Sequence, residues 1–354
     1  MDLAHQTPAN RAALCALLRS ASDAGRRVRI AGGGSGGRAG LVAPSPDEIA
    51  TTAQFDRIIV HEPADLIVSV EAGVPVRRLQ EALATHGQTW IQAPDVPGAT
   101  VGGLLARAAS GHRRLRYGAI RDSLLQVVIA TGDGRLVQAG GKTVKGVAGY
   151  DIPRLVVGAR GTLGVIVEAT LKLWPLPSSR AWFTAEGRVE ELAALGERVR
   201  RHVHQPAAIL LAPGRLDIEL IGPAEDLVAP PGMSPSEPAP VFGAPAVAQA
   251  GVPPATLARF AGELAATGVA FQAHLGVGVC TVAIEDGAQL EFVRARALEV
   301  GGHLVILDAP EELRRDPWGP PPAGLAIMRR LKAAFDPAGV LNRGQFIGDR
   351  TGAP

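Results

Sequence analysis

Apolar positions repeat along this chain with two different periods. Helical spacing predicts helices over residues 10–24, 75–87, 189–203, 255–267, 288–300 and 323–335. Short β-branched runs bounded by Pro, Gly and Asp predict strands, including one continuous strand over 270–284. The turn at Gly132, Asp133 and Gly134 lies between two such runs and predicts a β-hairpin. Together these patterns indicate an α+β chain.

The pattern divides the chain into three parts. We predict a first domain over residues 1–177, a smaller α+β unit over 178–322 and a terminal helix with a tail over 323–354. Inside the second unit, residues 222–254 are rich in Pro, Ala and Gly and show no periodicity. That composition predicts a long loop.

Composition narrows the functional classes. Lys and Arg number 36 against 34 Asp and Glu, and the resulting net charge of +2 does not indicate a nucleic-acid-binding surface. Cys15 and Cys280 are the only cysteines, too few for an iron–sulfur cluster, which normally takes about four thiolates. The first residues lack a signal-peptide pattern, and no apolar run approaches the roughly 20 residues of a membrane span. We therefore expect a soluble, cytoplasmic protein.

The glycine-rich segment Arg29–Gly40 is the strongest local signal. Gly32, Gly34 and Gly37 spell G-x-G-x-x-G, but prolines follow where a nicotinamide-dinucleotide loop requires a helix. The nicotinamide interpretation is therefore disfavoured. Consecutive glycines still allow several backbone N–H groups to face one phosphate. A phosphate cradle and a plain flexible turn remain the two alternatives.

Longer motifs around this segment resemble a known family. The chain resembles the FAD-binding domain of the vanillyl-alcohol oxidase / p-cresol methylhydroxylase type over about residues 25–177. The motifs are RIAGGGSGG, IIVHEPADLIVSVEAGVPVRRLQEAL, ATVGGLLARAASGHRRLRYGAIRDSLLQVVIATGDGRLV and VKGVAGYDIPRLVVGARGTLGVIVEATLKLWPLP. Within that family, KTVKGVAGYDIPRL and LKAAFDPAGVLNRGQF are most similar to FAD-binding subunits of glycolate oxidase. The resemblance implies a two-part FAD-binding domain, a small truncated α+β cap, and a terminal helix packing back on the FAD domain.

The resemblance also implies which residues contact FAD. The implied positions are Gly32, Gly33, Gly34, Ser35, Gly36, Thr100, Gly102, Gly103, Ser110, Gly111, Tyr117, Gly118, Asp122, Gly161, Gly164, Val165 and Ile166. The glycine loop would wrap the pyrophosphate mainly with amides, since Arg29 and Arg38 are the only cations expected close to it. Residues 110–118 would run along the flavin, and residues 161–166 would lie against adenine and ribose. Because some members attach FAD through a histidine in the loop, where this chain has Ser35, we expect non-covalent FAD.

Several of these assignments have a structural alternative. The glycines also suit tight strand packing, and Tyr117 also suits the core. The basic cluster in the same motif is expected to form a solvated face, with a flavin partner as the alternative; it comprises Arg113, Arg114, Arg116 and Arg121. Tyr150 and Asp151 are expected to be structural.

The substrate side carries a weaker pattern. Relatives that oxidise 2-hydroxy acids have a metal site with a pattern such as H-x-G-D-G-N-x-H. Here His274 is followed by Gly276 and Gly278, without the acid and the second histidine. A metal site needs several such ligands, so we expect no metal and predict that His274 is a hydrogen-bonded strand residue. No catalytic residue is assigned.

The FAD-binding motifs are intact, whereas the pattern expected on the substrate side is incomplete. Three functions are compatible with this difference. The favoured one is an FAD-binding subunit of a multi-subunit glycolate, or other 2-hydroxy acid, oxidase or dehydrogenase. Its partners would be a catalytic FAD subunit and an iron–sulfur subunit, with electrons relayed between them and at most peripheral contact with the inner face of the membrane. The alternatives are a free-standing FAD-dependent oxidoreductase of another hydroxy acid, alcohol or sugar, and a structural subunit without flavin turnover.

Overall fold

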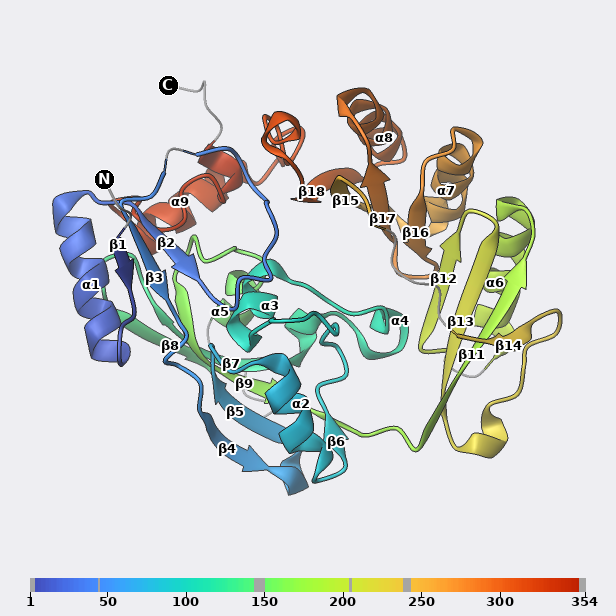
Figure 1. The fold of residues 1–354 in the computed structure, drawn as a ribbon, viewed down its shortest axis with the longest axis horizontal. Helices are drawn as coiled ribbons and strands as arrows, with labels where there is room; N and C mark the ends of the chain where they lie inside the picture. Colours follow the sequence, from blue (N-terminus) through green and yellow to red (C-terminus); the bar gives the residue numbers. More distant parts are fainter. Residues whose placement is uncertain (1–3, 44, 143–149, 204–205, 238–242, 350–354) are drawn as a thin grey trace.

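Figure 1 shows an N-terminal unit of two main sheets beside a second unit built on one larger sheet. This computed structural model describes residues 4–43, 45–142, 150–203, 206–237 and 243–349. The chain contains both helices and mostly antiparallel sheets, so the α+β prediction is confirmed.

A small parallel sheet opens the N-terminal unit. Its strands run in the order β1-β3-β2, with bounds β1 Ala4–Gln6, β2 Val28–Ala31 and β3 Glu48–Thr51. The helix α1, Arg11–Ala24, begins where Asn10 accepts a hydrogen bond from the Ala13 N–H, and it ends at Gly25 with φ of 64°. Both residues are those that capping preferences predict for a helix start and stop.

A five-stranded antiparallel sheet forms the second layer of this unit. Its order is β4-β5-β9-β7-β8, with bounds β4 Ile58–Glu62, β5 Ile67–Glu71, β7 Leu124–Ala130, β8 Leu136–Gly140 and β9 Val165–Lys172. β7 pairs antiparallel with β8, so the predicted hairpin is confirmed. The helices are α2 Val76–Ala84, α3 Val101–Arg107, α4 Arg114–Tyr117 and α5 Ile152–Val156, and a minor pair joins β6 Gln88–Thr89 to β10 Trp174–Pro175.

Two aliphatic cores hold the N-terminal unit together. Leu79 of α2 and Leu104 of α3 pack with Ala169 of β9 in one buried cluster. Leu18 of α1 packs with Val167 of β9 in another cluster, which also contains strand residues of the small sheet. The strand β9 therefore contributes to both cores and connects the two layers.

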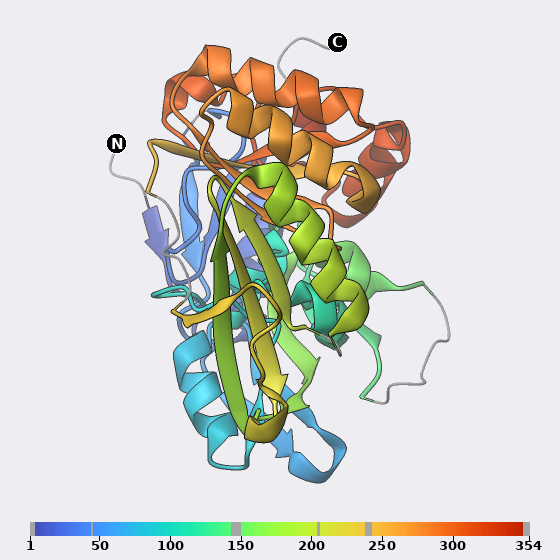
Figure 2. The same ribbon diagram turned by 90° about the vertical axis from the view of Figure 1, so that its right-hand side faces the viewer.

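The second unit is an eight-stranded sheet covered by helices on one face. The strand order is β14-β11-β13-β12-β16-β17-β15-β18. The bounds are β11 Ser179–Glu186, β12 Ala208–Ala212, β13 Arg215–Gly222, β14 Ser234–Ser236, β15 Ala246–Gly251, β16 Phe271–His274, β17 Val279–Ile284 and β18 His303–Asp308. Figure 2 shows the covering helices side by side; they are α6 Val189–His202, α7 Leu257–Ala266 and α8 Gly287–Glu299. Leu192, Phe260 and Val293 from these helices are buried in one core with the sheet.

Two predictions for this unit are wrong. Residues 222–254 are not simply a loop, because they contain β14 and β15, and β15 pairs with both β17 and β18 inside the sheet. The inward positions of β15 are alanines, whose small side chains gave no detectable apolar alternation. The strand predicted over 270–284 is the hairpin of β16 and β17, turned by Gly276 and Gly278 with φ of 78° and 83°.

The C-terminal segment returns to the N-terminal unit. After α9, Leu325–Phe335, the chain forms a parallel bridge between Leu341 and Val28. Asp336, only 2% exposed, accepts hydrogen bonds from the backbone of Val340 and Leu341. These contacts bring residues 342–345 to the end of β2, where the glycine loop begins.

Candidate cofactor site

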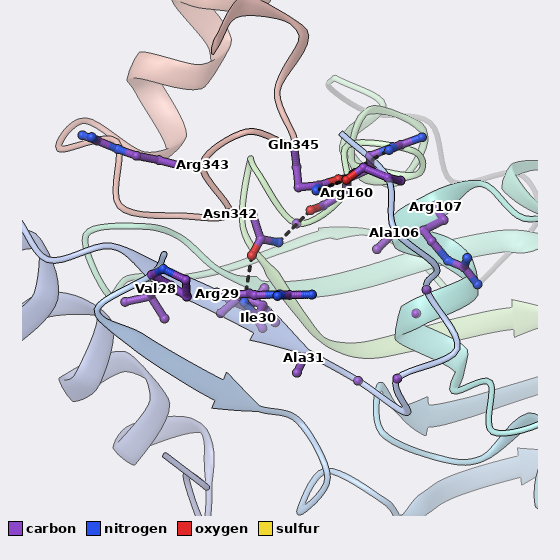
Figure 3. Close-up of a pocket in the computed structure, with 18 of the residues that line it drawn as sticks. Val28, Arg29, Ile30, Ala31, Ala106, Arg107, Arg160, Asn342, Arg343 and Gln345 are labelled. Atoms are coloured by element: carbon purple, nitrogen blue, oxygen red, sulfur yellow. Dashed lines mark hydrogen bonds between the residues drawn. The ribbon is translucent and has the colours of Figure 1, made fainter. Parts of the chain in front are cut away.

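A cleft of about 520 Å³ lies where the small sheet, α3 and the start of β9 meet. Figure 3 shows that its walls come from four stretches far apart in sequence. These are the β2 end with the glycine loop, the first and last turns of α3, residues 160–166, and residues 342–345. The predicted contact residues that line the cleft are Gly32, Gly33, Gly34, Ser35, Gly36, Gly102, Gly103, Gly161, Gly164, Val165 and Ile166.

The loop glycines have different physical roles. A Cβ atom on Gly33 would lie 1.8 Å from the Gly98 carbonyl oxygen, and one on Gly32 would lie 2.9 Å from the Thr100 hydroxyl. These two glycines are required by packing within the protein. A Cβ on Gly34 or Gly36 would meet no protein atom within 4 Å. The open space at Gly34 and Gly36 leaves backbone accessible, which is the property that a phosphate cradle requires.

The start of α3 forms the second wall. Thr100 caps this helix by accepting a hydrogen bond from the Gly103 N–H at 3.2 Å, and this predicted contact does not itself line the cleft. Gly102 lies so close to Ala72, the residue after β5, that an added Cβ atom would come within 2.7 Å of the Ala72 Cβ. Gly102 therefore permits close helix–strand packing, the structural alternative foreseen for these glycines.

Residues 160–166 form the third wall, and the C-terminal segment fixes their backbone. The Asn342 amide donates to the Arg160 carbonyl at 2.7 Å, and its oxygen accepts from the Ile30 N–H at 2.7 Å. The Gln345 amide donates to the Ala39 carbonyl at 2.6 Å. Asn342 and Gln345 were missed by sequence reasoning because they lie some 180 residues or more from the walls they join, and only the fold brings them together.

The expectation that Arg29 and Arg38 are the only cations near the loop is wrong. Arg38 is already paired, since its guanidinium donates to Asp308 of β18 at 3.1 Å. Arg107 and Arg160 also line the cleft, one at the end of α3 and the other before β9. Burial lowers the pKa of both guanidiniums from the ordinary value.

The remaining predicted contacts, Ser110, Gly111, Tyr117, Gly118 and Asp122, do not line this cleft. Ser110 accepts a hydrogen bond from the Ile120 N–H at 3.0 Å, and Asp122 accepts from the Ala119 N–H at 2.9 Å. Tyr117 lies edge-on to Trp174, with ring centroids 4.9 Å apart, and burial raises the pKa of its hydroxyl. Their role along the flavin stays a prediction.

In the basic cluster, Arg121 is exposed as predicted, with 62% of its side chain accessible, but Arg113 and Arg116 do not lie on a solvated face. Glu219 of β13 is fully buried and accepts two hydrogen bonds from Arg113, at 2.9 and 2.7 Å. His112 also bonds to Glu219, at 3.0 Å, and Arg116 donates to the Ile221 carbonyl at 2.6 Å. Only the sequence-distant β13 supplies the partner carboxylate, so the pairing could not be read from the motif. These contacts join the N-terminal unit to the uncovered face of the large sheet.

His274 lies on the same sheet, and its predicted state is wrong in one respect. The side chain is buried, but its Nδ1 has no hydrogen-bond partner among the described residues. Burial is the main cause that lowers the pKa of His274 to about 4, and His112 and Arg114 act in the same direction. The imidazole is therefore neutral at pH 7. Within the described ranges, no three His, Cys, Asp or Glu side chains are grouped as metal ligands.

Part of one motif lies outside the described residues, namely 143–149. Tyr150, which follows it, is 93% exposed. Asp151 caps α5 by accepting a hydrogen bond from the Arg154 N–H at 3.1 Å.

Comparison with known proteins agrees with this geometry. Residues 4–140 match the FAD binding domain family, and residues 318–346 match the family of FAD linked oxidases, C-terminal domain. The chain is 36% identical over 169 residues to a D-lactate dehydrogenase from Archaeoglobus fulgidus, covering 48% of this chain and 38% of that protein. It is 34% identical over 160 residues to glycolate oxidase subunit GlcE from Escherichia coli, covering 45% of this chain and 46% of that subunit.

A likeness in fold extends over nearly the whole chain. Alkyldihydroxyacetonephosphate synthase superimposes with a TM-score of 0.64 at 15% identity, covering 95% of this chain and 75% of that one. The sequence alignments above span less than half of either relative. Residues 4–140 therefore form an FAD-binding domain, and FAD is the cofactor of this chain. No helix in the described part of the chain is long and apolar enough to cross a membrane.

Proposed function

We propose that this chain is the FAD-binding subunit of a multi-subunit oxidase or dehydrogenase of glycolate or a related 2-hydroxy acid. The observation that carries the proposal is the cleft, whose glycine loop and α3 lie within the residues that match the FAD binding domain family. The names of the relatives support the substrate class, since they include glycolate oxidase subunits and dehydrogenases of D-lactate and D-2-hydroxyglutarate.

The residues of the cleft fit FAD bound without a covalent link. Gly34 and Gly36 leave backbone open toward the cleft, and Ser35 lies between them. Val165 and Ile166 offer an apolar wall at the start of β9. When bound, the flavin supplies a redox centre that accepts a hydride or electrons. The chain's own contribution is to hold the phosphates, orient the cofactor and exclude water from it.

The proposed partners are a catalytic FAD subunit and an iron–sulfur subunit, between which this chain would relay electrons. The subunit names of the glycolate oxidase relatives support an assembly of several chains. At the interface between the two units, Arg113 and His112 are already bound to Glu219 and are therefore not available to a substrate. This supports a substrate site on a partner chain. We place the complex in the cytoplasm, with at most peripheral contact with the membrane.

An anaerobic reduction experiment tests this proposal. The FAD-loaded chain is mixed with glycolate or D-lactate while flavin absorbance is followed, first alone and then with candidate catalytic subunits encoded beside it. We expect bleaching only when a catalytic subunit is present. Because FAD is held without a covalent bond, acid precipitation should leave it in the supernatant.

A free-standing FAD oxidoreductase of another hydroxy acid, alcohol or sugar is the second candidate. The sequence similarity to D-lactate dehydrogenases favours this second candidate. Fast bleaching of the isolated chain by either acid would replace the subunit proposal with this one.

A further inference from the structure

Among the arginines that line the cofactor cleft, Arg29, Arg107, Arg160, Arg314 and Arg343 form no ion pair within the described residues, and burial lowers the pKa of Arg107 and Arg160. Arg107 ends α3, and Arg160 lies in the turn before β9; Figure 3 shows both among the residues that line the cleft. Within the described residues, no hydrogen bond or ion pair involves the Arg107 side chain. Arg160 reaches only the neutral Gln345 amide oxygen, at 3.4 Å.

These two arginines differ from the paired cations of the same cleft. Arg27 binds Asp47 at 2.8 Å, and Arg38 binds Asp308 at 3.1 Å, so the charge of each is already compensated. Arg107 and Arg160 are partly desolvated, and Arg107 also repels Arg160 strongly enough to lower its pKa further. Two desolvated like charges without a counterion are unfavourable, so the cleft favours an anion.

The backbone at Arg160, which lines the cleft, has an unfavourable conformation. Its φ of 52° lies in the left-handed region, and Gly161 follows with φ of 70°. The Asn342 amide holds this turn through the Arg160 carbonyl. The left-handed backbone conformation disfavours any residue other than glycine at this position. A contact made by the side chain therefore explains why the residue is an arginine.

We propose that Arg107 and Arg160 bind the diphosphate of FAD and add charge to the amides of the glycine loop. The proposal rests on the assignment of this cleft to FAD. A diphosphate matches the ligand class, because it carries negative charge on several oxygens that guanidinium N–H groups bind well. The sequence-based expectation of a cradle made mainly of amides is thereby extended by two specific side chains.

The test compares the dissociation constants of FAD for the apoprotein and for two variants, Arg107→Gln and Arg160→Gln. We expect each variant to bind FAD about tenfold or more weakly, since one charge-assisted contact is lost. Added salt should weaken FAD binding to the unaltered protein more than to the variants, because screening acts on the charges removed. ADP, which carries the diphosphate, should compete less well in the variants, whereas riboflavin binding should not change.

Arg77→Gln is the matched control, because its side chain is 90% exposed on α2 and lies outside the cleft. Affinities and salt dependences equal to those of this control would overturn the proposal. Failure of the unaltered protein to bind FAD would instead overturn the assignment of the cleft. If Arg160→Gln lowers the melting temperature, the FAD affinities of Arg107→Gln and of the charge-preserving Arg160→Lys test the proposal instead. Full FAD affinity in Arg107→Gln would refute the role of Arg107.

Discussion

At the scale of single residues, a substitution at Gly36 tests the contact with FAD separately from packing inside the protein. Its backbone is not in the left-handed region, and an added Cβ would meet no protein atom within 4 Å. Gly33 is the opposite case, because its Cβ would overlap the Gly98 carbonyl oxygen at 1.8 Å. The two glycines look equivalent in the sequence, and only the packing around them distinguishes their roles.

We therefore expect Gly36→Val to lose most FAD affinity while its melting temperature stays close to that of the unaltered protein. Gly33→Val should lose both, because the backbone at Gly98 must move. Gly222→Val is the control, since a Cβ there also meets open space and Gly222 lies outside the cleft. Fluorescence titration with FAD and thermal unfolding are the measurements. Normal FAD affinity in Gly36→Val would mean that this part of the loop is only a turn.

At the scale of elements, the segment after α9 fixes the geometry of the cleft. Asn342 connects β2 to the turn before β9 through its bonds to Ile30 and Arg160. Its own φ of 45° is in the left-handed region, which asparagine tolerates better than most residues. The segment therefore acts as a brace between two walls that belong to different sheets.

Asn342→Ala should lower the free energy of unfolding by about 2 kcal/mol, because two side-chain bonds are lost and their backbone partners are left unpaired. FAD affinity should fall with it, since Arg160 loses its backbone support. Urea unfolding and FAD titration measure the two effects, with the exposed Arg330→Ala of α9 as the control. An unchanged unfolding midpoint would show that the brace is dispensable.

At the scale of the whole molecule, Glu219 makes a fully buried charged contact between the two units. Burial alone would raise the pKa of this carboxyl, but the hydrogen bonds from His112 and Arg113 hold the pKa below its ordinary value. A depressed carboxyl pKa stabilises the folded protein above the unfolded pKa of about 4.3 and loses that stabilisation as pH falls through the folded value. The interface should therefore weaken in acid.

Glu219→Gln should destabilise the protein at pH 7 by about 3 kcal/mol, because the Arg113 charge is left without its partner in a buried site. Its unfolding free energy should also fall less steeply than that of the unaltered protein between about pH 5 and pH 3. Denaturant unfolding over this pH range is the measurement. Glu186→Gln, at an exposed site at the end of β11, is the control. Parallel pH curves for Glu219→Gln and the unaltered protein would contradict the role given to Glu219.

Much of the fold was predictable because its signals are local. The caps Asn10 and Gly25, the hairpin turn at Gly132 and Gly134, and the helical periodicities all act over a few residues. The strand β15 was not predictable, because its small inward alanines make no periodic signal. Its place in the sheet depends on β17 and β18, which come later in the chain.

By itself, the sequence determined the α+β class, the glycine loop and the motif order that resembles an FAD-binding domain. Tertiary structure alone decided which charges are free. The partners of Arg38 and Arg113 lie 270 and 106 residues away, so no local pattern shows that these arginines are paired. Arg107 and Arg160 are left facing the cleft for the same reason. Coulomb interactions depend on distance in space and on solvent access, and neither quantity exists until the chain is folded.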